Sequence, residues 1–167
     1  MLRSQGHPNR TDHKTVGMMR NQALLVFSVG GRRLGARTED IAGVHLWQHA
    51  TPVPSDTPFV NAMVRFDNEC MPVFDLAGKL NQVLDSDSPL CLMIKHEDGL
   101  MAICIDAHIP SLHMVDPSTI RGKDSEDADI AGVCSAGDEQ VTVINCAGWE
   151  KVGRACVRII HAEDFDC

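Results

Sequence analysis

The sequence contains no tyrosine, and aromatic residues make up only 4% of its 167 residues. Proteins that bind single-stranded nucleic acid stack the bases on aromatic side chains, so this composition argues against such a surface. Positive charge is also scarce: 15 Lys and Arg stand against 23 Asp and Glu, and the net charge is −8. A chain with this balance is a poor match for nucleic acid or for an anionic membrane surface.

Long apolar runs are missing as well. No segment approaches the length of a membrane-spanning helix, and residues 1–22 contain no apolar stretch of signal-peptide length. These absences predict a cytoplasmic protein that does not insert into a membrane. Hydrophobic residues nevertheless make up 44% of the chain, which is enough for one domain with its own core.

The cysteines do not follow a metal-binding or disulfide pattern, because none form a Cys-x-x-Cys pair. Most lie in apolar runs such as Met101–Ile105. A buried free cysteine behaves as a small hydrophobic residue, so we expect reduced, structural thiols and a reducing compartment. The seven are Cys70, Cys91, Cys104, Cys134, Cys146, Cys156 and Cys167.

Short apolar segments separated by turn residues continue from Gln22 to the end of the domain. Residues 23–29 are followed by Gly30-Gly31, and Asp98-Gly99 separates residues 90–94 from 100–105; both dipeptides are hairpin signals. A spacing of about ten residues, without the regular helices that parallel crossovers need, predicts an all-β barrel or sandwich. Further strands are expected over residues 32–36, 71–76, 109–115, 130–134 and 140–146.

Alternating apolar positions in these runs predict the core. We expect these residues to be mostly buried: Leu25, Phe27, Ile41, Val73, Phe74, Ile103, Ile105, Val133 and Val143.

Some segments fit more than one structure. Residues 38–44 suit either a helical turn or a strand with a bulge at Gly43. Residues 149–160 suit one face of a helix or a strand, and we expect a helix. Residues 1–21 lack periodicity and predict a flexible tail. The expected organisation is this tail, a domain over residues 22–150 and a C-terminal extension over residues 151–167.

No residue pattern argues for catalysis, so we expect no catalytic residue, no metal and no cofactor. His45 and His49 have helical i,i+4 spacing but lack the glutamate of a zinc protease and any nearby acidic ligand. An apolar run raises the pKa of a cysteine, which disfavours a thiol nucleophile. Asp75 and Asp106 each follow an apolar strand, and we favour acceptors of backbone N–H bonds over an acid–base pair. A small thiol- or metal-dependent enzyme is the alternative function.

Taken in order, the segments resemble a CheW-like domain from about Leu24 to Trp149. The family's central motif is Asn-Leu-Arg-Gly, three further residues and Pro-Val/Ile-x-Asp-Leu; here Arg65-Phe66-Asp67-Asn68 and Pro72-Val73-Phe74-Asp75-Leu76 stand in its place. The remaining similar segments are Leu24–Val29, the apolar pair Ile41 and Val44, Pro52-Val53-Pro54, Pro58-Phe59-Val60, Ala102–Asp106, Ile130–Val133 with Gly132, and Val143-Ile144-Asn145.

The resemblance implies two small, intertwined five-stranded β-barrels around a shared apolar core. It also implies a non-enzymatic adaptor in bacterial chemosensory signalling, which binds the regulatory domain of a CheA-type histidine kinase and the cytoplasmic tip of chemoreceptors. The implied protein contacts are Ile41, Val44, Arg65, Phe66, Asp67 and Asn68. The implied structural residues are Pro72, Asp75, Asp106 and Gly132.

Three of the departures from the family pattern bear on backbone geometry or charge. Ala62 and Asn68 replace glycines, and Asn68 suits a left-handed backbone better than most residues. Asp67 reverses the charge of the family's arginine, and a wrong charge at an interface costs up to several kcal/mol. The departures predict a changed partner, for instance in a surface-motility or pilus-control array. A scaffold that has drifted and no longer binds a kinase is the alternative.

Overall fold

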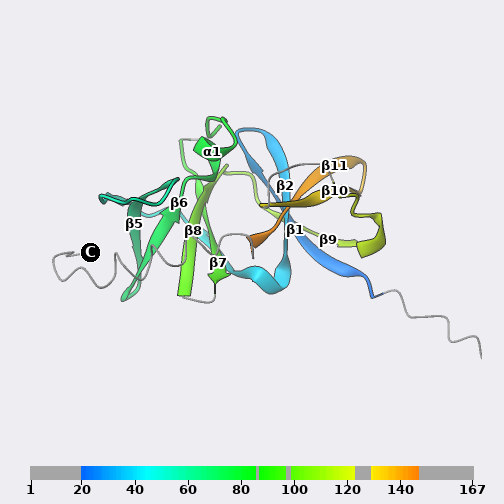
Figure 1. Ribbon diagram of the computed structural model, residues 1–167, viewed down its shortest axis with the longest axis horizontal. Coiled ribbons are helices and arrows are strands. Elements are labelled where there is room, and N and C mark those ends of the chain that lie inside the picture. Colours follow the sequence, from blue (N-terminus) through cyan, green and yellow to red (C-terminus); the bar gives the residue numbers. More distant parts are fainter. Residues whose placement is uncertain (1–19, 86, 97–98, 123–128, 147–167) are drawn as a thin grey trace, which may run out of the picture.

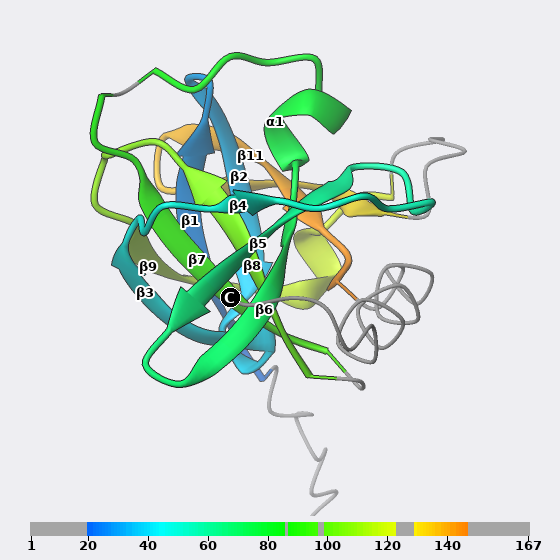
Figure 2. The same ribbon diagram turned by 90° about the vertical axis from the view of Figure 1, so that its left-hand side faces the viewer.

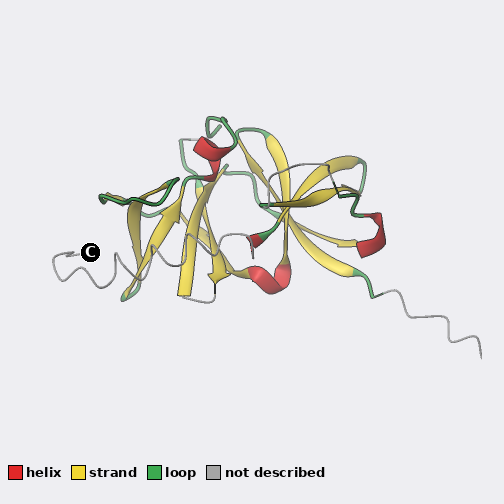
Figure 3. Cartoon of the chain, in the orientation of Figure 1, coloured by secondary structure: helices red, strands yellow, loops and turns green. Residues whose placement is uncertain are grey.

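A computed structural model describes residues 20–85, 87–96, 99–122 and 129–146. The expected tail lies almost entirely outside these residues, and the expected C-terminal helix lies entirely outside them. Strands dominate the described part, and the helices are single turns (Figure 3). The prediction of an all-β domain is therefore confirmed.

The strands form two sheets, which lie side by side in Figure 1. Sheet A has five strands in the order β10-β11-β2-β1-β9, and sheet B has six in the order β3-β7-β8-β6-β5-β4. Sheet B has one strand more than the expected five, because the two-residue strand β4 is added at its end. Sheet A consists of β1 (Gln22–Val29), β2 (Arg32–Arg37), β9 (Ser111–Val115), β10 (Ile130–Ala136) and β11 (Glu139–Ile144). Sheet B consists of β3 (Ile41–Leu46), β4 (Thr51–Pro52), β5 (Val60–Phe66), β6 (Glu69–Phe74), β7 (Leu90–His96) and β8 (Gly99–Ile105).

The chain passes from sheet A to sheet B and back again. It forms β1 and β2 of sheet A, then all of sheet B, and then returns to add β9, β10 and β11 to sheet A. Three short helices lie between strands: η1 (Thr38–Asp40), α1 (Leu76–Lys79) and η2 (Pro117–Thr119). Lys79 of α1 forms an ion pair with Asp129, the residue before β10. The helix between β6 and β7 of sheet B is therefore tied to sheet A.

Each sheet curls around its own apolar interior. In sheet B, the ring of His45 on β3 lies 5.4 Å from that of Phe66 on β5, although three strands separate β3 and β5 in the sheet order. In sheet A, the two outermost strands, β9 and β10, also contact each other. Figure 2 shows the strands of sheet B wrapped in this way. The curvature agrees with the expected pair of barrels.

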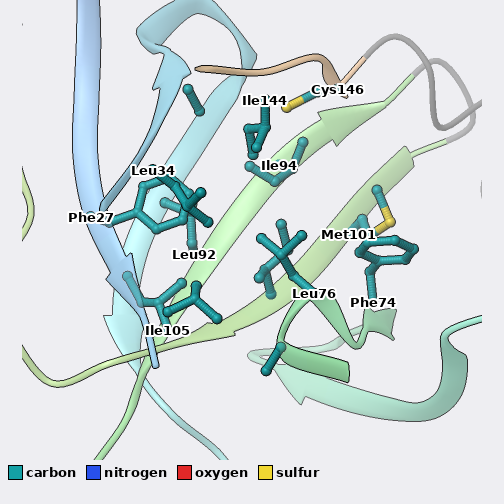
Figure 4. Close-up of a cluster of buried hydrophobic side chains, with 14 of the residues drawn as sticks. Phe27, Leu34, Phe74, Leu76, Leu92, Ile94, Met101, Ile105, Ile144 and Cys146 are labelled. Atoms are coloured by element: carbon teal, nitrogen blue, oxygen red, sulfur yellow. The ribbon is translucent and has the colours of Figure 1, made fainter. Parts of the chain in front are cut away.

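The largest apolar cluster lies between the two sheets, and we call it the shared core (Figure 4). It combines side chains of sheet A, such as Phe27 and Leu34, with side chains of sheet B, such as Leu92 and Ile103. Neighbouring residues on a strand point to opposite faces. Leu24 and Val26 therefore point away from the shared core, into the interior of sheet A.

Six of the nine predicted core residues are buried: Phe27, Val73, Phe74, Ile103, Ile105 and Val143. The other three are only partly buried. Leu25 and Ile41 pack against the rim of the shared core, and Val133 lies on β10, an outermost strand. An apolar pattern shows which face of a strand is covered but not how far from the rim the strand lies.

Pro72 is the fourth residue of β6, whereas the strand expected over residues 71–76 placed it at the strand's start. It lies opposite Met63 on β5, in the third pair beyond Phe66 and Glu69, which close the hairpin. Because hydrogen-bonded and non-hydrogen-bonded pairs alternate, the missing N–H of Pro72 faces away from β5. On that side β6 pairs with β8 only at Val73 and Phe74, so the sheet tolerates a proline here.

Asp106 joins the end of sheet B to the first hairpin of sheet A. Its fully buried carboxylate accepts N–H bonds from Gly30 (3.0 Å), Gly31 (2.9 Å) and Asp85 (2.9 Å). Both glycines have positive φ (58° and 78°), which turns their N–H groups toward the carboxylate. Burial alone would raise the pKa of Asp106, but the three N–H donors together lower it.

We predict that Asp106→Asn lowers the free energy of unfolding by about 2–4 kcal/mol at pH 7, because an amide cannot accept all three buried N–H bonds. The folded-state pKa is lowered, so the carboxylate's contribution is complete above its unfolded pKa of about 3.9 and is lost as the pH falls through the folded value. The difference between wild type and variant should therefore shrink below about pH 4. Urea unfolding from pH 7 to pH 3 measures it.

Asp138→Asn, in the exposed β10–β11 turn, is the matched control and should change stability by no more than about 0.5 kcal/mol. An effect of Asp106→Asn that is the same at pH 7 and pH 3 would contradict the charged role of this carboxylate.

Candidate protein-binding surface

Strand β3 lies at one end of sheet B, and among the described residues it pairs along one edge, with β7. Val44 and Leu46 on this strand have exposed fractions of 38% and 74%. They lie opposite Leu92 and Leu90, whose side chains face the shared core. The strand therefore continues the apolar face of the shared core out to the protein surface.

A β-bulge explains why Ile41 and Val44 share this face. Residues three apart on a regular strand point to opposite faces, but the register of β3 shifts between Ile41 and Gly43. As a result, Ile41 lies opposite Ile94 and Val44 lies opposite Leu92, both in the shared core. The two interpretations of residues 38–44 both hold, because the helical turn η1 comes directly before the bulged strand.

A second apolar edge was missed by the sequence analysis. Strand β9 lies at one end of sheet A, and its Leu112 and Met114 have exposed fractions of 64% and 61%. Leu112 lies opposite Leu25, which packs against the shared core. We call Ile41, Val44, Leu46, Leu112 and Met114 the apolar edges. The alternation of apolar Leu112 and Met114 with polar His113 was visible in the sequence, but the exposure of the two apolar side chains was not.

The predicted contact loop is the two-residue turn between β5 and β6. Asp67 and Asn68 are exposed at its tip. The left-handed residue of the turn is Asp67, with a φ of 51°, and Asn68 does not have a positive φ. Aspartate and asparagine tolerate this conformation better than most side chains. Backbone geometry is thus one reason for an aspartate at position 67.

Arg65 folds over the same turn. Its guanidinium donates to the backbone oxygen of Asp67 (3.3 Å) and to the side-chain oxygen of Asn68 (3.4 Å), while its side chain stays exposed. The tip of the turn therefore combines a carboxylate with a guanidinium. A positive charge is present on the turn even though position 67 carries the opposite sign.

The predicted contacts form two surfaces rather than one. Val44 faces the shared core, whereas its neighbour His45 faces the interior of sheet B and contacts the half-buried Phe66. Phe66 packs there against a cluster that includes Val64 and Cys91. The β5–β6 turn is thus anchored on the opposite face of sheet B from Val44.

The remaining predicted residues fix the backbone. Asp75 caps α1 by accepting the N–H of Gly78 at 2.8 Å. Gly132 lies at a register shift in β10, where an added Cβ would stand 2.4 Å from the carbonyl oxygen of Arg121. That carbonyl accepts the N–H of Val133 at 2.9 Å, so the close approach holds the preceding loop against β10.

Acid–base, thiol and metal chemistry find little support in the described residues. They contain no group of three His, Cys, Asp or Glu side chains arranged to hold a metal ion. His45 lies on a strand, so the helical spacing considered for His45 and His49 does not apply. Burial raises the pKa of Cys146 to about 12, which leaves its thiol protonated. No described helix is long and apolar enough to cross a membrane.

Residues 23–147 match the family model of the CheW-like domain. The chain belongs to the CheW-like domain family. This family consists of non-enzymatic scaffold domains of chemotaxis, so the chain is a CheW-like scaffold domain whose expected partners are chemosensory proteins. The resemblance seen in the motifs is confirmed.

The fold is similar to that of the scaffolding protein TtCheW from Thermoanaerobacter tengcongensis. The TM-score is 0.70, and the match covers 94% of this chain and 99% of that chain at 16% sequence identity. No curated protein matches the sequence. The CheW-like fold is thus retained although few residues are shared with that structure.

We predict that Gly132→Ala destabilises the domain by about 2–4 kcal/mol, because its Cβ would collide with the Arg121 carbonyl and its φ of 156° disfavours side chains. Chemical denaturation measures the loss. Gly122→Ala is the matched control, since an added Cβ there meets nothing within 4 Å. Equal stabilities of the two variants would show that the backbone around Gly132 relaxes freely.

Proposed function

We propose that this CheW-like domain is an adaptor in bacterial chemosensory signalling, which couples a CheA-type histidine kinase to chemoreceptors or to a related motility or pilus-control array. Family membership supports a scaffold role. The observation that carries the proposal is the exposure of large apolar side chains on edge strands, at positions continuous with the shared core. Contiguous exposed apolar surface and unpaired strand edges are features of protein-docking sites.

An adaptor must hold two partners at once, and the placement of the two surfaces suits this requirement. Val44 faces the shared core, and Phe66 beneath the β5–β6 turn faces the other side of sheet B. A partner docked on the apolar edges therefore leaves the β5–β6 turn accessible. We assign one partner to the apolar edges and the other to the turn formed by Arg65, Phe66, Asp67 and Asn68.

We expect substitutions on the two surfaces to affect different partners. Val44→Asp and Leu46→Asp each place a charge in an apolar contact and should weaken binding of one partner at least about tenfold. They should spare the partner that uses the β5–β6 turn. Calorimetric titration with the kinase regulatory domain and with a receptor-tip fragment measures both affinities for each variant.

Val83→Asp is the matched control for this experiment, because Val83 has an exposed fraction of 86% and belongs to neither surface. Its affinities should equal those of the wild type. If Val44→Asp, Leu46→Asp and the Asp67 variants described next all weaken binding of the same single partner, the two-surface assignment is wrong. If no variant changes either affinity, the adaptor contacts lie elsewhere.

Asp67 tests whether the partner has changed with this chain. If the partner offers Lys or Arg opposite Asp67, Asp67→Asn removes the attraction while keeping a side chain that tolerates the left-handed backbone. Binding should then weaken by roughly 1–3 kcal/mol, and Asp67→Arg should weaken it at least as much. Titrations at two salt concentrations should show a smaller loss at high salt.

Glu69→Gln removes a neighbouring exposed charge and controls for the general field of the turn. A thermal melt of each variant separates binding from folding, because Arg at a positive φ also strains the backbone. Unchanged affinity of Asp67→Asn, with a partner that binds the wild type, would show that Asp67 serves only the backbone of the turn.

A further inference from the structure

Cys91 on β7 and Cys104 on β8 lie directly opposite each other. Residues His96 and Gly99 form the pair that closes this two-residue hairpin, and Cys91 and Cys104 form the fifth pair beyond it. Hydrogen-bonded and non-hydrogen-bonded pairs alternate, starting from a hydrogen-bonded closing pair. The two cysteines therefore occupy a non-hydrogen-bonded position, and their side chains point to the same face of sheet B.

This position meets the geometric requirements of a disulfide. In a non-hydrogen-bonded pair the two Cα atoms are about 4.5 Å apart and the Cβ atoms approach about 4.5 Å. A disulfide needs Cα atoms about 4.4–6.8 Å apart and Cβ atoms about 3.5–4.5 Å apart. Rotation of the two side chains, with little movement of the backbone, can therefore bring the sulfur atoms together.

Among the described cysteines, this arrangement is specific to the pair. Cys70 lies opposite Arg65, and Cys134 lies opposite Val141. Cys146 follows the last strand and packs in the shared core. All of them, including Cys91 and Cys104, are free thiols in the structure.

The surroundings of the pair determine which thiol reacts first. Cys91 is fully buried, in the interior of sheet B, whereas Cys104 is half-buried and more accessible. Burial, together with a smaller contribution from the nearby Cys104, raises the pKa of Cys91 to about 12. Burial also raises the pKa of Cys104 to about 12, with contributions from Asp106 and Asp75. Both thiols are therefore weak nucleophiles at neutral pH.

We propose that Cys91 and Cys104 form a redox modification site, which a small-molecule disulfide converts into a disulfide bond across β7 and β8. The thiolate of Cys104 attacks one sulfur of the small molecule, which forms a mixed disulfide and releases one small-molecule thiolate. The thiolate of Cys91 then attacks the Cys104 sulfur and releases the second. The two protons of the protein thiols pass to the two released thiolates, so one disulfide is reduced for each one formed.

The test uses the full-length folded protein and oxidised glutathione, followed by alkylation, digestion and mass spectrometry. We expect a cross-linked peptide that joins Cys91 to Cys104, with a loss of about 2 Da for the two hydrogens. The rate should rise about tenfold for each pH unit between pH 7 and pH 9, because the thiolate fraction does so for a pKa near 12. An ordinary surface thiol levels off near the top of this range.

Cys104→Ser should abolish the cross-link, whereas Cys70→Ser should leave it unchanged, since Cys70 is also half-buried but has no cysteine opposite. Peptide mapping of the wild type decides the question even if a variant fails to fold. Recovery of Cys91 and Cys104 as free thiols, or of a stable glutathione adduct on Cys104 that does not close, would overturn the proposal. A cross-link that forms only in denaturant would overturn it as well.

Discussion

A buried carboxylate links the two sheets, alongside the shared core and the ion pair of Lys79 with Asp129. Asp106 follows the last strand of sheet B and holds the glycine turn of the first hairpin of sheet A by two N–H bonds. Burying a charge without partners would be strongly unfavourable, so the carboxylate and the turn require each other. This contact sets where β1 and β2 lie against sheet B. The convex faces of the sheets can then meet as the shared core, and the apolar edges of β3 and β9 lie at its rim.

Much of this architecture could be predicted from the sequence, because it rests on local signals. Gly30-Gly31 and Asp98-Gly99 mark hairpins through backbone geometry, and alternation marks the buried face of each strand. The order of strands in the sheets is a different matter, since it depends on contacts between distant segments. No local pattern indicates that β11 pairs with β2, or that β9 joins β1. The family resemblance implied two intertwined five-stranded barrels, and the structure supplies the strand order.

The candidate surfaces illustrate the same division. The family resemblance indicated that Ile41 and Val44 belong to one contact surface. The β-bulge at Gly43 explains why these residues, three apart on one strand, share a face. The sequence showed that Asn68 tolerates a left-handed backbone, but aspartate tolerates it as well, and the structure places that geometry at Asp67. Leu112 and Met114 could be read as interior residues of a strand. Their exposure follows from the position of β9 at the end of a sheet, which alternation cannot reveal.

The passage of the chain from sheet A to sheet B and back has a consequence for the order of folding. Sheet B is made from one continuous stretch of chain, whereas β1 and β2 are synthesised before it and β9, β10 and β11 after it. During synthesis the first hairpin therefore emerges with only part of its own sheet available. Sheet A closes only when the last strands leave the ribosome, and such long-range pairing is intrinsically slow. In the interval the apolar side of β1, including Leu24 and Val26, lacks the strands that cover it in the finished domain. Apolar surface and strand edges that are uncovered during this interval favour aggregation of the nascent chain.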